Sequence, residues 1–91
     1  MVALENAGMI VYDIPDSLRP FGNYLRKVLR RAGALPVNLS VYFVPWADVP
    51  RINGIIEAAK KRYAIEIADA IQNPGGNRPL RVNILKFDDA T

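Results

Sequence analysis

Apolar residues are grouped along the chain in segments whose spacing predicts strands and helices in alternation. A continuous apolar run over residues 9–12, which ends at Asp13, has the length and the β-branched and aromatic members typical of a buried central strand. Residues 80–87 form the last predicted strand. It follows the stretch Pro-Gly-Gly-Asn at residues 74–77, which is typical of a turn.

Two other stretches repeat their apolar residues every three or four positions, the period of a helix with one buried face. The first is capped by Asp16 or Ser17 and extends to about Ala32, before Gly33. Its predicted buried positions are Leu18, Phe21, Leu25, Val28 and Leu29. The second covers residues 49 to about 71 behind a cap at Asp48, and its predicted buried positions are Ile52, Ile55, Ile56, Ala59, Tyr63, Ile67 and Ile71.

The segment over residues 36–45 alternates between two sets of side chains, as a strand does. We expect one set, Val37, Leu39, Val41 and Phe43, to face the helices. The other set, Asn38, Ser40, Tyr42 and Val44, would then face the opposite way, which would put Tyr42 on the open side of the sheet. The segment is long enough to bend and to form two adjacent strands.

This order predicts a single α+β domain over residues 1–91, with its core at about 8–87. The expected architecture is a ferredoxin-like split βαβ sandwich, in which one antiparallel sheet carries two helices on one face. A chain of 91 residues buries only roughly 60–65% of its unfolded surface, so it supports one thin core. We therefore expect the other sheet face to be covered by a second copy in a homodimer.

Composition narrows the chemistry that the chain can perform. It contains no cysteine and no histidine, which excludes a disulfide framework, thiolate metal sites and the commonest general base. The glycine-rich nucleotide-binding motifs are also absent. No apolar run approaches the ~20 residues that span a bilayer, and no signal-peptide pattern opens the chain, so we expect a cytoplasmic protein without a membrane partner.

Asp13 is the candidate catalytic and metal-binding residue. A carboxylate where a strand turns towards a helix can bind Mg²⁺, with water completing the coordination shell. A single carboxylate per chain supplies few ligands for a metal ion, but a dimer axis near this strand end would bring two carboxylates together. The alternative is structural, with Asp13 capping the helix or pairing with an arginine.

Basic residues are concentrated in the first predicted helix, although the net charge is only +3. Five cations occur there with no acid between them, and Arg78 adds another before the last strand. The candidate nucleic-acid-binding residues are Arg19, Arg26, Lys27, Arg30, Arg31 and Arg78. They are suited to a phosphate backbone, whereas a solvated helix face is the simpler explanation. Tyr12, Tyr24 and Tyr42 could stack on bases if exposed, or lie in a dimer interface.

Two segments resemble a known family. Residues 11–16, Val-Tyr-Asp-Ile-Pro-Asp, and residues 38–42, Asn-Leu-Ser-Val-Tyr, are similar to the first-strand and second-strand motifs of the CRISPR-associated protein two family, the small subunit of spacer acquisition. Arg19 and Gly33 fit the intervening helix in order and spacing. The resemblance covers about residues 8–45, with Asn38 where the family usually has glutamine.

The resemblance implies a ferredoxin-like homodimer in an antiviral defence system. It assigns to Asp13 the role of holding Mg²⁺ in a nuclease site between subunits. It also implies a scaffold that binds duplex DNA or RNA through basic residues and bridges the CRISPR spacer integrase. Related domains with a similar opening occur in VapD-type ribonucleases and in the C-terminal part of PaaX-type transcription repressors.

Two functions are therefore compatible with the sequence. The first is a nucleic-acid-binding protein of the CRISPR-associated kind, with a possible Mg²⁺-dependent endonuclease site. The second is a non-enzymatic ferredoxin-like assembly or regulatory module, whose open sheet face is closed by oligomerisation.

Overall fold

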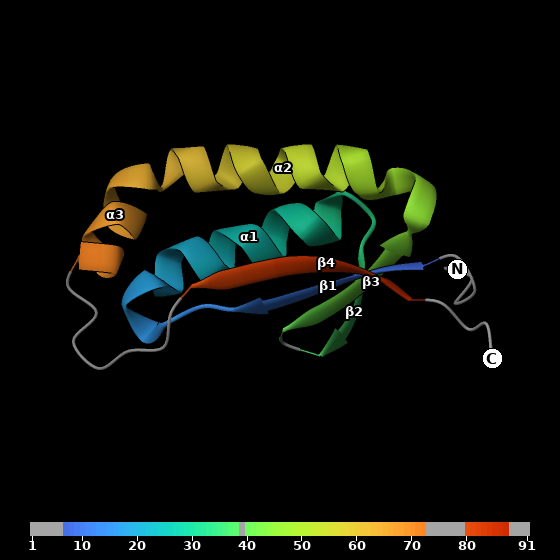
Figure 1. Ribbon diagram of the computed structural model, residues 1–91, viewed down its shortest axis with the longest axis horizontal. Coiled ribbons are helices and arrows are strands. Elements are labelled where there is room, and N and C mark those ends of the chain that lie inside the picture. The colour runs from blue at the N-terminus through green and yellow to red at the C-terminus, as the bar shows by residue number, and fades with distance from the viewer. Residues whose placement is uncertain (1–6, 39, 73–79, 88–91) are drawn as a thin grey trace.

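The computed structural model describes residues 7–38, 40–72 and 80–87 and confirms the predicted α+β class. Its elements are β1 (Ala7–Asp13), η2 (Asp16–Leu18), α1 (Arg19–Arg31), β2 (Leu35–Asn38), β3 (Val41–Pro45), η3 (Trp46–Asp48), α2 (Val49–Arg62), α3 (Ala64–Gln72) and β4 (Arg81–Phe87). The strands form one antiparallel sheet in the order β2-β3-β1-β4. The helices lie on one side of it (Figure 1), an arrangement compatible with a ferredoxin-like split βαβ fold.

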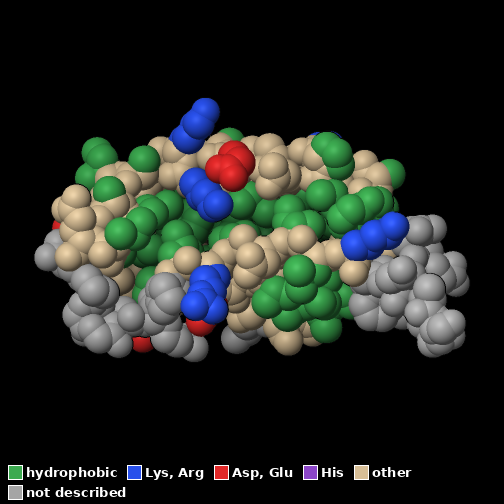
Figure 2. Space-filling model, in the orientation of Figure 1, with side chains coloured by type: hydrophobic (Ala, Val, Ile, Leu, Met, Phe, Trp, Pro, Cys, Tyr) green, Lys and Arg blue, Asp and Glu red, His purple; other side chains and the backbone are tan. Residues whose placement is uncertain are grey.

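The core lies between the helices and the sheet. As predicted, Leu18, Phe21, Leu25 and Leu29 of the first helical segment are fully or almost fully buried, while Val28 is partly buried against them. From the sheet, the buried partners are Ile10, Tyr12, Tyr42 and Val44. Coverage is weaker beside β4, where Val82 and Ile84 are only partly buried. Figure 2 shows hydrophobic surface along this side of the molecule, between the helix layer and the sheet.

The end of α1 follows the sequence prediction, and its start does not. Gly33 adopts a φ of 93°, while the Gly33 and Ala34 N–H groups donate to the Arg30 and Leu29 carbonyls at 3.1 and 3.0 Å. These two bonds are those of a Schellman motif. At the start, neither Asp16 nor Ser17 forms a side-chain cap, because a 3-10 turn precedes α1 and Leu18 occupies the cap position.

The N-cap position predicted at Asp48 is confirmed for α2. The Asp48 side chain makes no capping hydrogen bond there. Its carboxylate instead pairs with Arg51 at 3.2 Å, one turn further along the helix. That guanidinium also donates to the Ala32 carbonyl at 2.8 Å, which ties the start of α2 to the end of α1.

The segment 36–45 does form two strands, but the predicted facing of its side chains is wrong. Tyr42 and Val44 are each 1% exposed and face the helices, whereas Val41 and Phe43 are only partly buried on the opposite side. Both sets contain large apolar side chains, so alternation alone did not distinguish them. The ladder with β1 decides the facing, because Tyr42 lies opposite the buried Ile10.

The second predicted helix is divided into α2 and α3 at Tyr63, whose φ of −111° and ψ of 25° depart from helical geometry. The Tyr63 ring lies 5.7 Å from that of Phe21 and 5.6 Å from that of Tyr24, measured between centroids. Ile52, Ile56 and Ala59 are buried as predicted, whereas Ile71 is 70% exposed. The turn predicted at 74–77 lies outside the described residues.

None of the helices in the described ranges has the length and apolar character required to cross a membrane.

Two glycines provide a matched test of the helix ends. At Gly33 an added Cβ meets no atom within 4 Å, so Gly33→Ala should lower the free energy of unfolding by about 1 kcal/mol through backbone strain alone. Gly54, inside α2, is equally open, and Gly54→Ala should raise it by about 0.5–1 kcal/mol. Urea denaturation of both variants checks the opposite signs, and equal signs would contradict the role assigned to Gly33.

Candidate functional site

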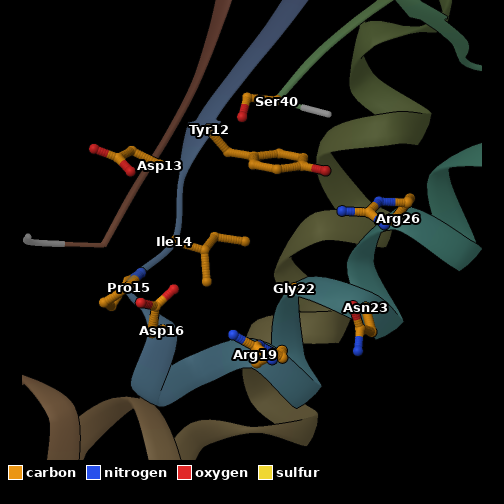
Figure 3. Close-up of a pocket in the computed structure, with 10 residues that line it drawn as sticks. All are labelled: Tyr12, Asp13, Ile14, Pro15, Asp16, Arg19, Gly22, Asn23, Arg26 and Ser40. Atoms are coloured by element: carbon orange, nitrogen blue, oxygen red, sulfur yellow. The ribbon is translucent and has the colours of Figure 1, made fainter. Parts of the chain in front are cut away.

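The carboxyl end of β1 opens into a cavity of about 270 Å³, which we call the strand-end cavity. Its walls come from β1, the turn into α1, one face of α1 and the turn between β2 and β3 (Figure 3). The lining residues are Tyr12, Asp13, Ile14, Pro15, Asp16, Arg19, Gly22, Asn23, Arg26 and Ser40. The cavity therefore contains the first-strand motif picked out from the sequence, together with two of the candidate basic residues.

Backbone contacts hold the turn between β2 and β3 against the end of β1. The Tyr12 N–H donates to the Ser40 carbonyl at 3.0 Å, and the Ser40 N–H donates to Asn38 Oδ1 at 2.8 Å. The first bond fixes Ser40 at the wall of the cavity. The second gives Asn38, the departure from the family pattern, a role in the turn.

Alternation along β1 separates the two side chains that end it. Tyr12 is 6% exposed and turns towards the helices, whereas the Asp13 carboxylate points away from the Tyr12 ring (Figure 3). Asp13 lies opposite Arg81 in the ladder with β4, so an arginine is its direct cross-strand neighbour. The site thus has two sides, an acidic one at Asp13 and a basic one beyond Tyr12.

The side chains at the strand-end cavity that could coordinate a Mg²⁺ ion offer oxygen atoms, but they are few. Asp13, Asp16 and the Ser40 hydroxyl belong to the strand-end cavity, and the described residues contain no group of three or more acidic, histidine or cysteine side chains that could hold a metal. Arg19 and Arg26 line the same cavity and oppose a cation there. The described residues of one chain are therefore a poor fit to Mg²⁺, and a site built from them would need carboxylates from a second copy.

The candidate basic residues divide into two groups. Arg26 lies seven residues after Arg19 and Arg30 four after Arg26, spacings that return to one face of a helix. Arg26 and Arg30 also line a second cavity, next to β2. Lys27 and Arg31 line neither cavity. Arg78 lies outside the described residues.

A pair of tyrosines lies beneath this basic face. The Tyr12 and Tyr42 rings are 6.0 Å apart between centroids, and both are buried. Burial raises the pKa of the Tyr42 hydroxyl from 10.0 to about 12, and the neighbouring Tyr12 adds to the rise, while the charges of Arg26 and Arg30 act against it. The sequence predicted Tyr42 on the open face, so it gave no indication that the Tyr12 and Tyr42 rings are neighbours. The register of β3 against β1 places them on the same face.

Comparison with protein-family models gives a match over most of the chain. The model of the family described as the PaaX protein central Cas2-like domain matches residues 8–80. It supports the fold relationship to the CRISPR-associated protein two family that the two motifs suggest, and goes no further towards a CRISPR or VapD assignment. It also places the likeness to PaaX in that protein's central domain, where the sequence analysis had placed it in the C-terminal part. No curated protein and no solved structure matches the chain.

The raised pKa of Tyr42 predicts a loss of stability at alkaline pH. Because the unfolded chain releases this proton near pH 10.0 and the folded chain near about 12, the contribution of Tyr42 is complete below pH 10 and is lost as the pH rises through about 12. Urea denaturation at several pH values from neutral to alkaline should show a smaller alkaline loss for Tyr42→Phe than for the wild type. Equal losses in the two proteins would contradict the assignment.

Proposed function

Because the chain belongs to the PaaX protein central Cas2-like domain family, we propose that it is a non-enzymatic regulatory module that assembles as a homodimer through the open face of its sheet. The open face is the side of the sheet turned away from the helices. PaaX is a regulator, and the small number of metal donors among the described residues of one chain favours assembly over catalysis.

A row of apolar side chains across all four strands carries this proposal. Leu35 of β2 pairs with Phe43 of β3, Phe43 pairs with Met9 of β1, and Met9 pairs with Leu85 of β4. Directly opposed residues project from the same face of a sheet, so these four form one continuous row. Next to it, Val41 pairs with Val11.

The two ends of this apolar row are exposed to solvent. Leu35 and Leu85, at its two ends, are 47% and 49% exposed, and the described helices all lie on the other side of the sheet (Figure 1). A contiguous apolar surface of this kind marks an interaction site in a monomer. A second copy supplies the same apolar row in a two-fold arrangement, in which one patch is complementary to itself.

A charge placed in this row should separate the dimer. We expect the wild type to be dimeric in light scattering coupled to gel filtration and Leu85→Lys to be monomeric, because a lysine at the contact would have to be desolvated. Ile65→Lys is the matched control, since Ile65 is 82% exposed on α3 and lies outside the open face. The variant should stay dimeric.

Circular dichroism should show that both lysine variants remain folded. A monomeric wild type at micromolar concentration, or equal loss of the dimer in the two variants, would contradict the proposed interface.

A second candidate function is that of a nucleic-acid scaffold or Mg²⁺-dependent nuclease, and the facing of Asp13 favours it. Met9, Val11 and Asp13 alternate along β1, so the carboxylate lies on the same face as the apolar row. A dimer formed through that face would bring two Asp13 carboxylates towards one interface. Arg19, Arg26 and Arg30 would then contact the phosphate backbone of duplex DNA or RNA. They would make the same contacts to nucleic acid in a complex with a CRISPR spacer integrase.

A cleavage assay separates the regulatory module from the nuclease. On single-stranded RNA and duplex DNA, with Mg²⁺ or with EDTA, we expect no cleavage by the wild type and no difference from Asp13→Asn. The control variant is Glu66→Gln, an exposed acid on α3 that does not line the strand-end cavity. Cleavage that requires Mg²⁺, disappears in Asp13→Asn and persists in Glu66→Gln would establish the nuclease instead.

A further inference from the structure

A second cavity, of about 380 Å³, lies between α1 and the β2–β3 hairpin, and we call it the hairpin cavity. Its lining residues are Arg26, Arg30, Pro36, Val37, Asn38 and Tyr42. No acidic residue is among them, which distinguishes it from the strand-end cavity with Asp13 and Asp16. Arg26 lines both cavities. On one side it therefore faces a cavity that contains two carboxylates, and on the other a cavity with no acidic lining residue.

A buried polar atom of the hairpin cavity, Arg26 Nε, has no hydrogen-bond partner within the described part of the chain. The Tyr12 hydroxyl lies on the other side of Arg26, in the strand-end cavity, and points towards the Arg26 guanidinium (Figure 3). It also interacts with the Tyr42 hydroxyl. Arg26 Nε carries a proton to donate, and leaving such a group buried and unsatisfied is unfavourable. This atom therefore requires an acceptor.

The other groups at the hairpin cavity are also suited to an acceptor. Arg30 adds a second guanidinium one turn from Arg26, and the charges of both reach the Tyr42 hydroxyl. The Tyr42 hydroxyl also lines the cavity and, like any tyrosine hydroxyl, is protonated at neutral pH. Two cations and one phenol hydroxyl, with no carboxylate among the lining residues, form a donor set that matches an anion carrying several oxygen atoms.

From this convergence we propose that the hairpin cavity is an oxyanion-binding site, in which Arg26 and Arg30 hold a small phosphate or carboxylate group and the Tyr42 hydroxyl adds a hydrogen bond. The site is separate from the open face, so it does not depend on dimer assembly. Asp13 and Asp16 repel an anion from the strand-end cavity and leave the hairpin side as the place for it.

The test is titration of the full chain with inorganic phosphate, and separately with acetate, followed by isothermal calorimetry and by amide NMR shifts. At least one of the two anions should bind saturably, and the shifts should centre on Arg26, Arg30 and Asn38. Arg26→Gln should weaken binding roughly tenfold or more, because it removes a charged donor. Tyr42→Phe, which keeps the ring and removes the hydroxyl that lines the cavity, should weaken it severalfold.

Lys27→Gln is the matched control, since it removes the same charge from the same helix but at a position that lines neither cavity. It should change the affinity less than twofold. If Lys27→Gln weakens binding as much as Arg26→Gln, the anion is attracted only by net charge and the proposal is wrong.

Two further results would also overturn the site. One is the absence of saturable binding of both phosphate and acetate. The other is binding of a duplex DNA that neither free anion can compete off, which would identify the arginines as backbone contacts instead. Should Arg26→Gln fail to fold, Tyr42→Phe together with Arg30→Gln decides the matter, because unchanged affinity in both would exclude the assignment.

Discussion

The alternation of side chains along β1 is the constraint on which the rest of the structure depends. β1 is paired on both sides, with β3 and with β4, so it has no freedom to turn about its own axis. Ile10 and Tyr12 enter the core beneath the helices, and their neighbours Met9, Val11 and Asp13 are therefore committed to the open face. A shift by one residue would exchange the two sets, burying Asp13 and exposing Tyr12.

The same constraint determines where the charges of α1 lie. Phe21, Leu25 and Leu29 must pack on the buried face of the sheet, and this fixes the rotation of the helix. Arg26 and Arg30 are then placed on the flank beside the β2–β3 hairpin, where they line a cavity. Basic residues that look like one cluster in the sequence are thus separated by packing into a set at the cavities and a set away from them.

Much of the fold could be predicted from the sequence because the signals are local. The apolar spacing in α1, Gly33 after its last turn and the bend in segment 36–45 each depend on neighbouring residues. The facing of Tyr42 does not, since Val41, Tyr42, Phe43 and Val44 are all apolar enough to be buried. Only the pairing of β3 with β1, which joins segments about thirty residues apart, resolves it. The break at Tyr63 likewise coincides with non-local contacts, those of its ring with Phe21 and Tyr24 of α1.

The candidate site could be predicted only in part, because only some of its residues give a local signal in the sequence. Asp13 could be picked out because a carboxylate at the end of an apolar strand is visible in sequence. The relation of Tyr12 to Arg26 could not, because it arises where the end of β1 meets the middle of α1. The dimer, the metal and the nucleic-acid contacts remain predictions, as does the position of Arg78.

The choice between regulation and catalysis depends on assembly more than on the chain itself. The acidic side of the strand-end cavity offers Asp13 and Asp16, with Arg19 and Arg26 lining the same space, so the field at this point is mixed in sign. A divalent cation needs more negative charge than that, and the Asp13 of a second copy is one source of it. The apolar row does not impose this requirement, since Leu35, Met9 and Leu85 would lose water in any face-to-face arrangement. Formation of the proposed dimer would therefore not depend on whether its geometry brings the two carboxylates together.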